Sequence, residues 1–185
     1  MNVLILGVDH EIQKVDAWRS EEMKTAYRDL LREIVGHYEV QFIGEEVGPD
    51  DETVGAQLTA ALNLPFPWRN IDMPETARKA ACIFQEQRDR VPEPRLGTVQ
   101  THLAADGFYF DLGNGSHEYC PRVPSDSVRE DYMFARALEG AGEACSMLIL
   151  VGNLHVEELA ARFVAHGDAT TQDAVYRYPW YNPYW

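Results

Sequence analysis

Cysteine is scarce in this chain, and basic side chains are outnumbered by acidic ones. Cys82, Cys120 and Cys145 are widely spaced, odd in number and form no CxxC pair, so no disulfide framework is predicted and a reducing cytoplasm is the expected location. Lysine and arginine together number 16 against 30 aspartates and glutamates, a formal net charge of -14. This charge argues against binding to nucleic acid or an anionic membrane, because neutralising phosphate requires clustered cations.

Long apolar runs are also lacking. The first residues carry no basic segment, and the apolar run at residues 3–6 is too short for a signal peptide or a membrane span. We therefore expect no membrane partner. With 185 residues, a hydrophobic fraction of 45% and four tryptophans, the chain is expected to form a single globular domain over residues 1–185.

Apolar runs of strand length alternate with helical patterns along most of the chain. The uninterrupted runs at residues 3–6 and 146–151 are typical of strands buried on both faces of a parallel sheet, and shorter strands are expected at 38–43 and 68–72. The helix after Pro74 is expected to run to Arg90; the other predicted helices begin near Ser20, Asp51 or Thr53, Ser125 or Ser127, and Val156. We predict an α/β fold with helices flanking a mainly parallel central sheet.

Two segments depart from this alternation. Residues 91–124 are rich in proline and glycine without a clear period, and we interpret them as an irregular insertion, with room for a small hairpin, that could cover a site as a lid. Residues 175–185 are strongly aromatic. Packing against the domain, as an edge strand for example, is the preferred interpretation of this tail; a contact between subunits of a homo-oligomer is the alternative.

Polar side chains follow the predicted strands at the points where these end. His10 and His155 each come three positions after a strand-ending glycine, Glu45 and Glu46 follow the second strand, and Asp72 follows the third. In open α/β sheets, ligands bind at this carboxyl edge, so these side chains are expected to meet. The competing interpretations are a solvated loop for the glutamate pair and ordinary loop histidines.

Imidazole and carboxylate groups are suitable ligands for a divalent metal ion. We predict that His10, Glu46 and His155 bind such an ion, zinc or manganese, whose bound water would act as a nucleophile near neutral pH. No HExxH motif is present. The four other histidines are interpreted as surface residues: His37, His102, His117 and His166. Of these, His102 or His117 could reach the site from the insertion.

Three further side chains complete the predicted catalytic set. Glu45 or Asp72 would assist as a base or by orienting a histidine. Arg129, at the start of a helix directed at the same edge, would stabilise a developing oxyanion. A salt bridge from Arg129 to Glu130 or Asp131 is the alternative.

These residues resemble the pattern of a known group of proteins. Gly7-x-x-His10, Glu45-Glu46, Arg129-Glu130 and Gly152-x-x-His155 are similar to the motifs of the TraB/Tiki superfamily, which groups with erythromycin-esterase-like and ChaN-like proteins. The resemblance implies an α/β fold with a site formed by the two histidines, the glutamate and the arginine. Members are described as metal-dependent peptidases, as esterases in which a histidine activates water, or as haem-binding proteins.

The leading hypothesis from the sequence is a metal-dependent hydrolase that acts on a small-molecule or peptide substrate. One alternative is a hydrolase without metal, in which His10 or His155 and a glutamate activate water directly. Another is a module that binds a haem-like or small anionic ligand in the same crevice without turnover.

Overall fold

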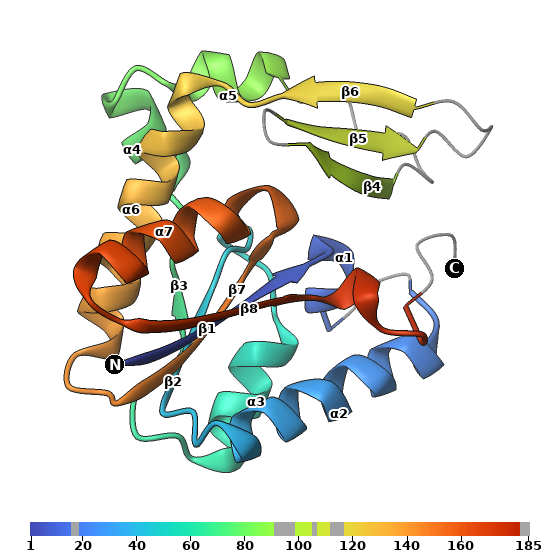
Figure 1. Cartoon of the computed structure of the whole chain (residues 1–185), viewed down its shortest axis with the longest axis vertical. Helices are drawn as coiled ribbons and strands as arrows, with labels where there is room; N and C mark the ends of the chain where they lie inside the picture. The colour runs from blue at the N-terminus through green and yellow to red at the C-terminus, as the bar shows by residue number, and fades with distance from the viewer. Residues whose placement is uncertain (16–18, 91–98, 105–106, 112–116, 182–185) are drawn as a thin grey trace.

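Five parallel strands form the central sheet of the protein. The computed structural model describes residues 1–15, 19–90, 99–104, 107–111 and 117–181. The sheet has the order β3-β2-β7-β1-β8 (Figure 1), and its strands are β1 (Asn2–Val8), β2 (Phe42–Glu45), β3 (Arg69–Asn70), β7 (Ser146–Gly152) and β8 (Ala169–Ala174). Every pairing within it is parallel, which confirms the predicted α/β fold.

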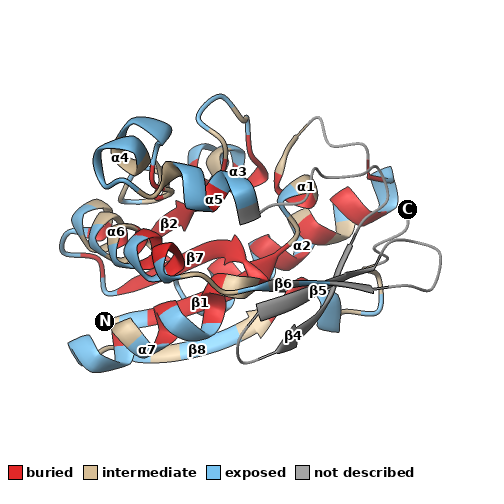
Figure 2. Cartoon of the chain, turned by 90° about the horizontal axis from the view of Figure 1, so that it is seen from above, coloured by how far each residue is buried: buried red, intermediate tan, exposed pale blue. Residues whose placement is uncertain are grey.

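Helices cover both faces of this sheet. Alternate residues of β1 point to opposite faces: Leu4 and Leu6 belong to the core cluster under α2 (Glu21–His37) and α3 (Val54–Leu62). Val3 and Ile5 belong to the cluster under α6 (Pro124–Ala141) and α7 (Val156–His166). Figure 2 shows the buried strands between these two helical layers. No helix in the described part of the chain is long and apolar enough to cross a membrane.

The helix boundaries follow local capping chemistry. The Ser20 hydroxyl accepts a hydrogen bond from Met23 N at 3.2 Å, and Thr53 accepts one from Ala56 N at 3.1 Å, as predicted for α2 and α3. The predicted cap of α6 at Ser125 or Ser127 is wrong. The helix begins at Pro124, and its first turn is capped by the Asp126 carboxylate, which accepts a hydrogen bond from Val123 N at 3.0 Å.

The helix predicted after Pro74 is divided into two. α4 (Glu75–Ala80) and α5 (Phe84–Arg90) are separated by a turn in which Cys82 has a φ of 59°. One further helical turn, α1 (His10–Gln13), lies between β1 and α2, where no helix was predicted; the Asp9 side chain caps it by accepting from Glu11 N at 3.0 Å. Both differences matter for the site, since α1 carries His10 and α5 lies beside α6.

The predicted irregular insertion contains a small antiparallel sheet. Its strands β4 (Val99–Ala104), β5 (Gly107–Asp111) and β6 (His117–Pro121) pair in the order β4-β5-β6, and Figure 1 shows them beyond the carboxyl ends of the central strands. Residues 91–98, 105–106 and 112–116 of the insertion lie outside the described residues. The insertion therefore stands on the side of the sheet where the site was expected; its role as a lid stays a prediction.

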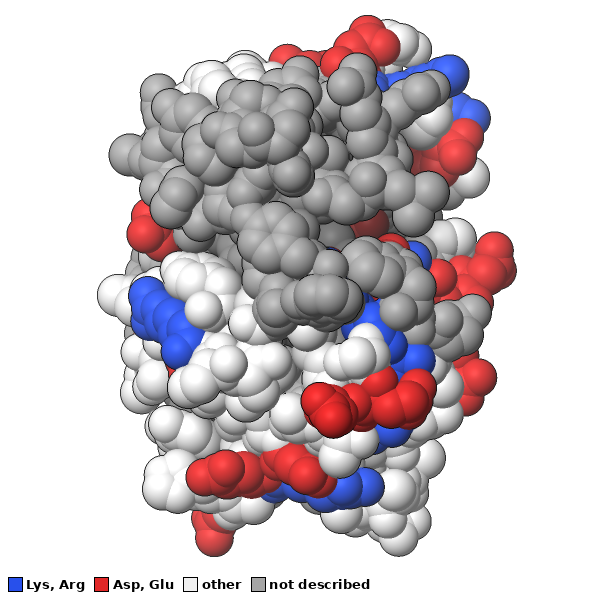
Figure 3. All heavy atoms as spheres, turned by 90° about the vertical axis from the view of Figure 1, so that its right-hand side faces the viewer, with Lys and Arg blue, Asp and Glu red and all other residues white. Residues whose placement is uncertain are grey.

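The aromatic tail packs on the domain, as preferred from the sequence. Tyr178, Trp180 and Tyr181 contact the core cluster under α2 and α3. In its described residues, 175–181, the tail adds no strand to the sheet; the edge position is taken by β8 directly before it, and η2 (Val175–Arg177) follows. On the described part of the face in Figure 3, basic side chains lie next to acidic ones, as expected of a chain with an excess of acidic residues.

Candidate functional site

The site is centred on the carboxylate of Glu46, at the carboxyl end of β2. Its backbone N–H donates to Leu150 O at 2.8 Å, which continues the pairing with β7, and Gly152 N donates to the carboxylate Oε2 at 2.8 Å. The residue is only 4% exposed. The neighbouring strand therefore fixes both the backbone and the side chain of this glutamate.

Two histidines face this carboxylate from different strands. His10 Nε2 lies 3.8 Å from Glu46 Oε2, and His155 Nε2 lies 3.5 Å from Glu46 Oε1. β1 and β7 are neighbours, but the chain leaves them towards opposite faces, through α2 and α7. In open α/β sheets such a switch point is where ligands bind, and here it brings together the two Gly-x-x-His histidines, as predicted.

The glycine of each motif provides space for the other motif. A Cβ on Gly152 would lie 3.1 Å from His10 Nε2, and a Cβ on Gly7 would lie 2.2 Å from Asn153 Oδ1. Asn153 begins the 3-10 turn η1 (Asn153–His155), which delivers His155. These glycines therefore permit close approach of the two strand ends.

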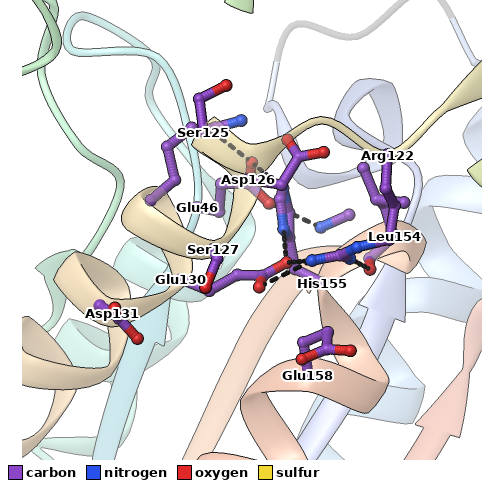
Figure 4. A network of polar contacts seen from close by, with 12 residues as sticks. Glu46, Arg122, Ser125, Asp126, Ser127, Glu130, Asp131, Leu154, His155 and Glu158 are labelled. Carbon is purple, nitrogen blue, oxygen red and sulfur yellow. Dashed lines mark hydrogen bonds and ion pairs between the residues drawn. The ribbon is translucent and has the colours of Figure 1, made fainter. Parts of the chain in front are cut away.

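Each histidine is oriented through its second ring nitrogen. His10 Nδ1 is 2.7 Å from Gln13 Oε1, and His155 Nδ1 is 2.9 Å from Glu130 Oε1. Glu130 is fully buried and accepts two hydrogen bonds from Arg122 Nη2, at 2.7 and 2.8 Å (Figure 4). Because Nδ1 of each neutral ring then carries the proton, both Nε2 lone pairs are directed at the space beside Glu46.

Arg129 joins the site from α6 and holds two carboxylates. Its Nη2 donates to Glu46 Oε1 at 2.8 Å and to Asp72 Oδ1 at 2.6 Å, and its Nη1 donates to Gln87 Oε1 at 3.3 Å. Asp72 also accepts from Arg78 Nη2 at 2.5 Å. The alternative pairing of Arg129 with its sequence neighbours is wrong, and Asp72 lies between two guanidinium groups.

These charges shift the pKa values of the site. Burial alone would raise the pKa of Glu46, but the positive charges of His155 and His10, when these rings are protonated, and of Arg129 hold it well below its usual range. Desolvation lowers the pKa of His10, but the negative charge of Glu46 and the hydrogen bond to Gln13 outweigh it, and the net shift is upward. Glu46 is therefore a fixed anion beside a histidine that readily accepts a proton.

Glu45 points away from Glu46, as consecutive strand residues do. It is fully buried and accepts hydrogen bonds from Thr53 Oγ1 at 2.6 Å, Trp68 Nε1 at 2.8 Å and Gln13 Nε2 at 3.1 Å. Burial raises its pKa to about 7, against the opposing effect of these donors. Of the two adjacent glutamates, Glu46 faces the two histidines. Glu45 is connected to the site only indirectly, through its hydrogen bond with Gln13.

The other predicted candidates divide into two groups. The ring of His166 is half exposed and lies 2.9 Å from Asp168, and His37 ends α2 on the surface. The side chains of His102 and His117 lie outside the described residues, so their approach to the site is untested. Three residues of the site were not predicted from the sequence: Gln13, Gln87 and Arg122. Glu130 was considered only as a partner of Arg129.

Comparisons with protein-family models, curated proteins and solved structures find no match for this chain. The resemblance to the TraB/Tiki superfamily therefore stays a prediction. Among the residues that the structure describes, no group of three or more His, Cys, Asp or Glu side chains is arranged to hold a metal ion. The chemistry of the site has to be argued from its own geometry.

Proposed function

We propose that the protein is a hydrolase in which a histidine activates water beside the Glu46 carboxylate. The observation that carries this proposal is that two Nε2 atoms face one buried carboxylate, at 3.5 and 3.8 Å, while both Nδ1 atoms are held by other side chains. An imidazole with a free Nε2 lone pair, fixed orientation and an adjacent anion is suited to general base catalysis.

His10 is the better candidate for the base. Its side chain is 48% exposed and so accessible to water and substrate, whereas that of His155 is 4% exposed. His10 would take a proton from water, the Glu46 charge would stabilise the resulting imidazolium, and the same proton would pass to the leaving group. Glu45 and Asp72 already accept several hydrogen bonds each, so we assign them supporting roles.

Arg129 has two possible contributions to such a reaction. Its hydrogen bonds to Glu46 and Asp72 hold the carboxylate in place, and we propose this as its main role. Stabilisation of an oxyanion, as predicted from the sequence, would fall to the remaining donors of the guanidinium, among them Nε, which is buried and has no hydrogen-bond partner among the described residues.

A metal-dependent hydrolase is the second candidate. The N, N, O donor set of His10, His155 and Glu46 fits zinc in kind, but the two histidines face different oxygens of Glu46, at 3.8 and 3.5 Å, and the described side chains form no group arranged to hold an ion. Gln13 and Glu130 would orient the two histidine ligands, and the ion would lower the pKa of a bound water. Against this, Arg129 already places a positive charge at Glu46.

The test combines elemental analysis with an activity screen. Purified wild type, His10→Ala and His155→Ala are compared on a panel of esters, amides and short peptides, with and without chelator; His166→Ala is the matched control, because its ring pairs with Asp168 instead. Chelator-insensitive turnover that His10→Ala abolishes supports the first candidate. Near-stoichiometric metal that both site variants remove supports the second. Binding of a small anion without turnover would replace both with the ligand-binding module.

A reducing cytoplasm remains the proposed location. Cys82 and Cys145 are exposed free thiols, which suit a reducing compartment. A small-molecule or peptide substrate is the proposed partner of the site.

A further inference from the structure

Gln13 connects the proposed base to a buried carboxylate on the far side of α1. Its side chain is fully buried. One end of the amide lies 2.7 Å from His10 Nδ1, and the other lies 3.1 Å from Glu45 Oε1. Glu45 points away from Glu46, and its hydrogen bond to Gln13 connects it to His10.

The orientation of this amide is determined by the partners of Glu45. Trp68 Nε1 can only donate, and it lies 2.8 Å from Glu45 Oε2. The Thr53 hydroxyl accepts from Ala56 N, so its own proton is directed to the same Oε2 at 2.6 Å. When Glu45 is ionised, as it is at the pH of the measurement below, its Oε1 remains as an acceptor for Gln13, which must then present its NH2 group to Glu45 and its oxygen to His10.

We propose that Glu45 and Gln13 are positioning residues that set the tautomer of His10. An amide oxygen facing Nδ1 requires that nitrogen to carry the proton, so the Nε2 lone pair is left free towards Glu46 and the substrate. The inference rests on the proposed function only in giving Nε2 the role of base. The tautomer itself is a property of the protein without substrate.

The surroundings of Glu45 are built for this close contact. A Cβ on Gly55, in the first turn of α3, would lie 2.6 Å from Glu45 Oε2. The glycine therefore lets the helix approach the carboxylate, and Thr53 is brought to it by capping the same helix. Because Thr53, Gln13 and Glu45 are all fully buried, water does not compete for these hydrogen bonds.

Replacing the Glu45 carboxylate by an amide is expected to reverse the orientation of the Gln13 amide. In Glu45→Gln, the new amide oxygen must stay opposite the donor-only Trp68, so its NH2 group faces Gln13. Gln13 then turns its oxygen to residue 45 and its NH2 to His10, whose Nδ1 becomes an acceptor. His10 is expected to carry its proton on Nε2, and kcat/KM on a substrate found in the screen should fall by about 100-fold or more.

The double variant Glu45→Gln with Trp68→Phe provides the rescue. Without the indole N–H, the new amide can rotate, give its NH2 to Thr53 Oγ1 and its oxygen to Gln13, and so restore the original tautomer. Trp68→Phe alone keeps the carboxylate and should leave the tautomer unchanged. This pattern of loss and recovery is not expected from general damage to the fold.

The measurement is the 15N–1H correlation spectrum of the imidazoles at about pH 9, well above the ordinary histidine pKa of about 6.5; His10→Gln identifies the signals. An Nδ1–H tautomer in the wild type that changes in Glu45→Gln and returns in the double variant supports the inference. An Nε2–H tautomer in the wild type, or an unchanged one in Glu45→Gln, overturns it. If Glu45→Gln does not fold, Gln13→Leu must lose the Nδ1–H preference. Correct tautomers in a protein without hydrolase activity would overturn the proposed function alone.

Discussion

The two Gly-x-x-His segments deliver the same side chain to the same carboxylate in different surroundings. His10 is half exposed and held by a neutral amide, Gln13, while His155 is 4% exposed and held by the carboxylate of Glu130. The Glu130 carboxylate links His155 to Arg122, whereas the amide oxygen of Gln13 fixes the tautomer of His10 without adding charge. The comparison indicates a division of labour, in which His10 exchanges protons and His155 holds the site together.

The largest effect is expected from removing the support of His155. Glu130→Ala would leave His155 and Arg122 without their shared buried partner and Arg162 without a carboxylate at 3.4 Å. Breaking such a buried pair costs about 3–5 kcal/mol, to be measured as the free energy of unfolding in urea. Glu139→Ala removes an exposed carboxylate paired with two arginines and serves as the control, with a much smaller loss expected because solvent screens exposed ion pairs. Equal losses in both variants would contradict the division of labour.

The support of His10 is expected to respond to pH. Burial raises the pKa of Glu45 to about 7 from an ordinary value of 4.5, so the folded protein binds the proton more tightly, and ionising this group opposes folding as pH rises from about 4.5 to above 7. Over that window the wild type should lose up to roughly 3 kcal/mol that Glu45→Gln does not lose. Urea unfolding of both proteins at several pH values measures the difference in their free energies of unfolding. A difference that stays constant with pH would refute this prediction.

Much of the fold and part of the site could be predicted from the sequence. Uninterrupted apolar runs indicated β1 and β7, but β8 was missed because its edge position leaves Thr171 and Gln172 exposed and no apolar run is required. The paired glycines and histidines indicated the site. Which of Glu45 and Glu46 faces the histidines depends on strand alternation, and hence on a register that the sequence does not specify.

The residues that orient the histidines were harder to find. Gln13 follows His10 by three positions, a spacing that brings side chains together on a helix, but one helical turn has no periodicity to reveal it. Glu130 was visible only as the neighbour of Arg129, and Arg122 reaches it from the end of the insertion. Partners of this kind are fixed by tertiary packing, which leaves no local signal in the chain.

Filling the space between the two segments should have unequal effects. In Gly7→Ala the new Cβ would lie 2.2 Å from Asn153 Oδ1 and 2.9 Å from Val156 Cγ2, both in the packed interior, so a loss of about 1–3 kcal/mol in unfolding free energy is expected. In Gly152→Ala the nearest atom, at 3.1 Å, belongs to the ring of His10, which can move. That variant should lose less stability but more activity. Gly36→Ala, with nothing within 4 Å, is the control and should be neutral or stabilising by up to about 1 kcal/mol.

The smallest effect is expected where the C-terminal tail meets the segment of His10. Tyr181 donates a hydrogen bond to Asp9 Oδ2 at 3.2 Å, and Asp9 caps α1 and pairs with Arg19 at 2.5 Å. Tyr181→Phe removes one of these contacts and leaves the others, so the unfolding free energy should fall by about 0.5–1.5 kcal/mol. Because the cap of α1 remains, activity should change less than in Gln13→Leu. A larger loss of activity than in Gln13→Leu would mean that the tail, rather than the hydrogen bond to Gln13, holds His10 in place.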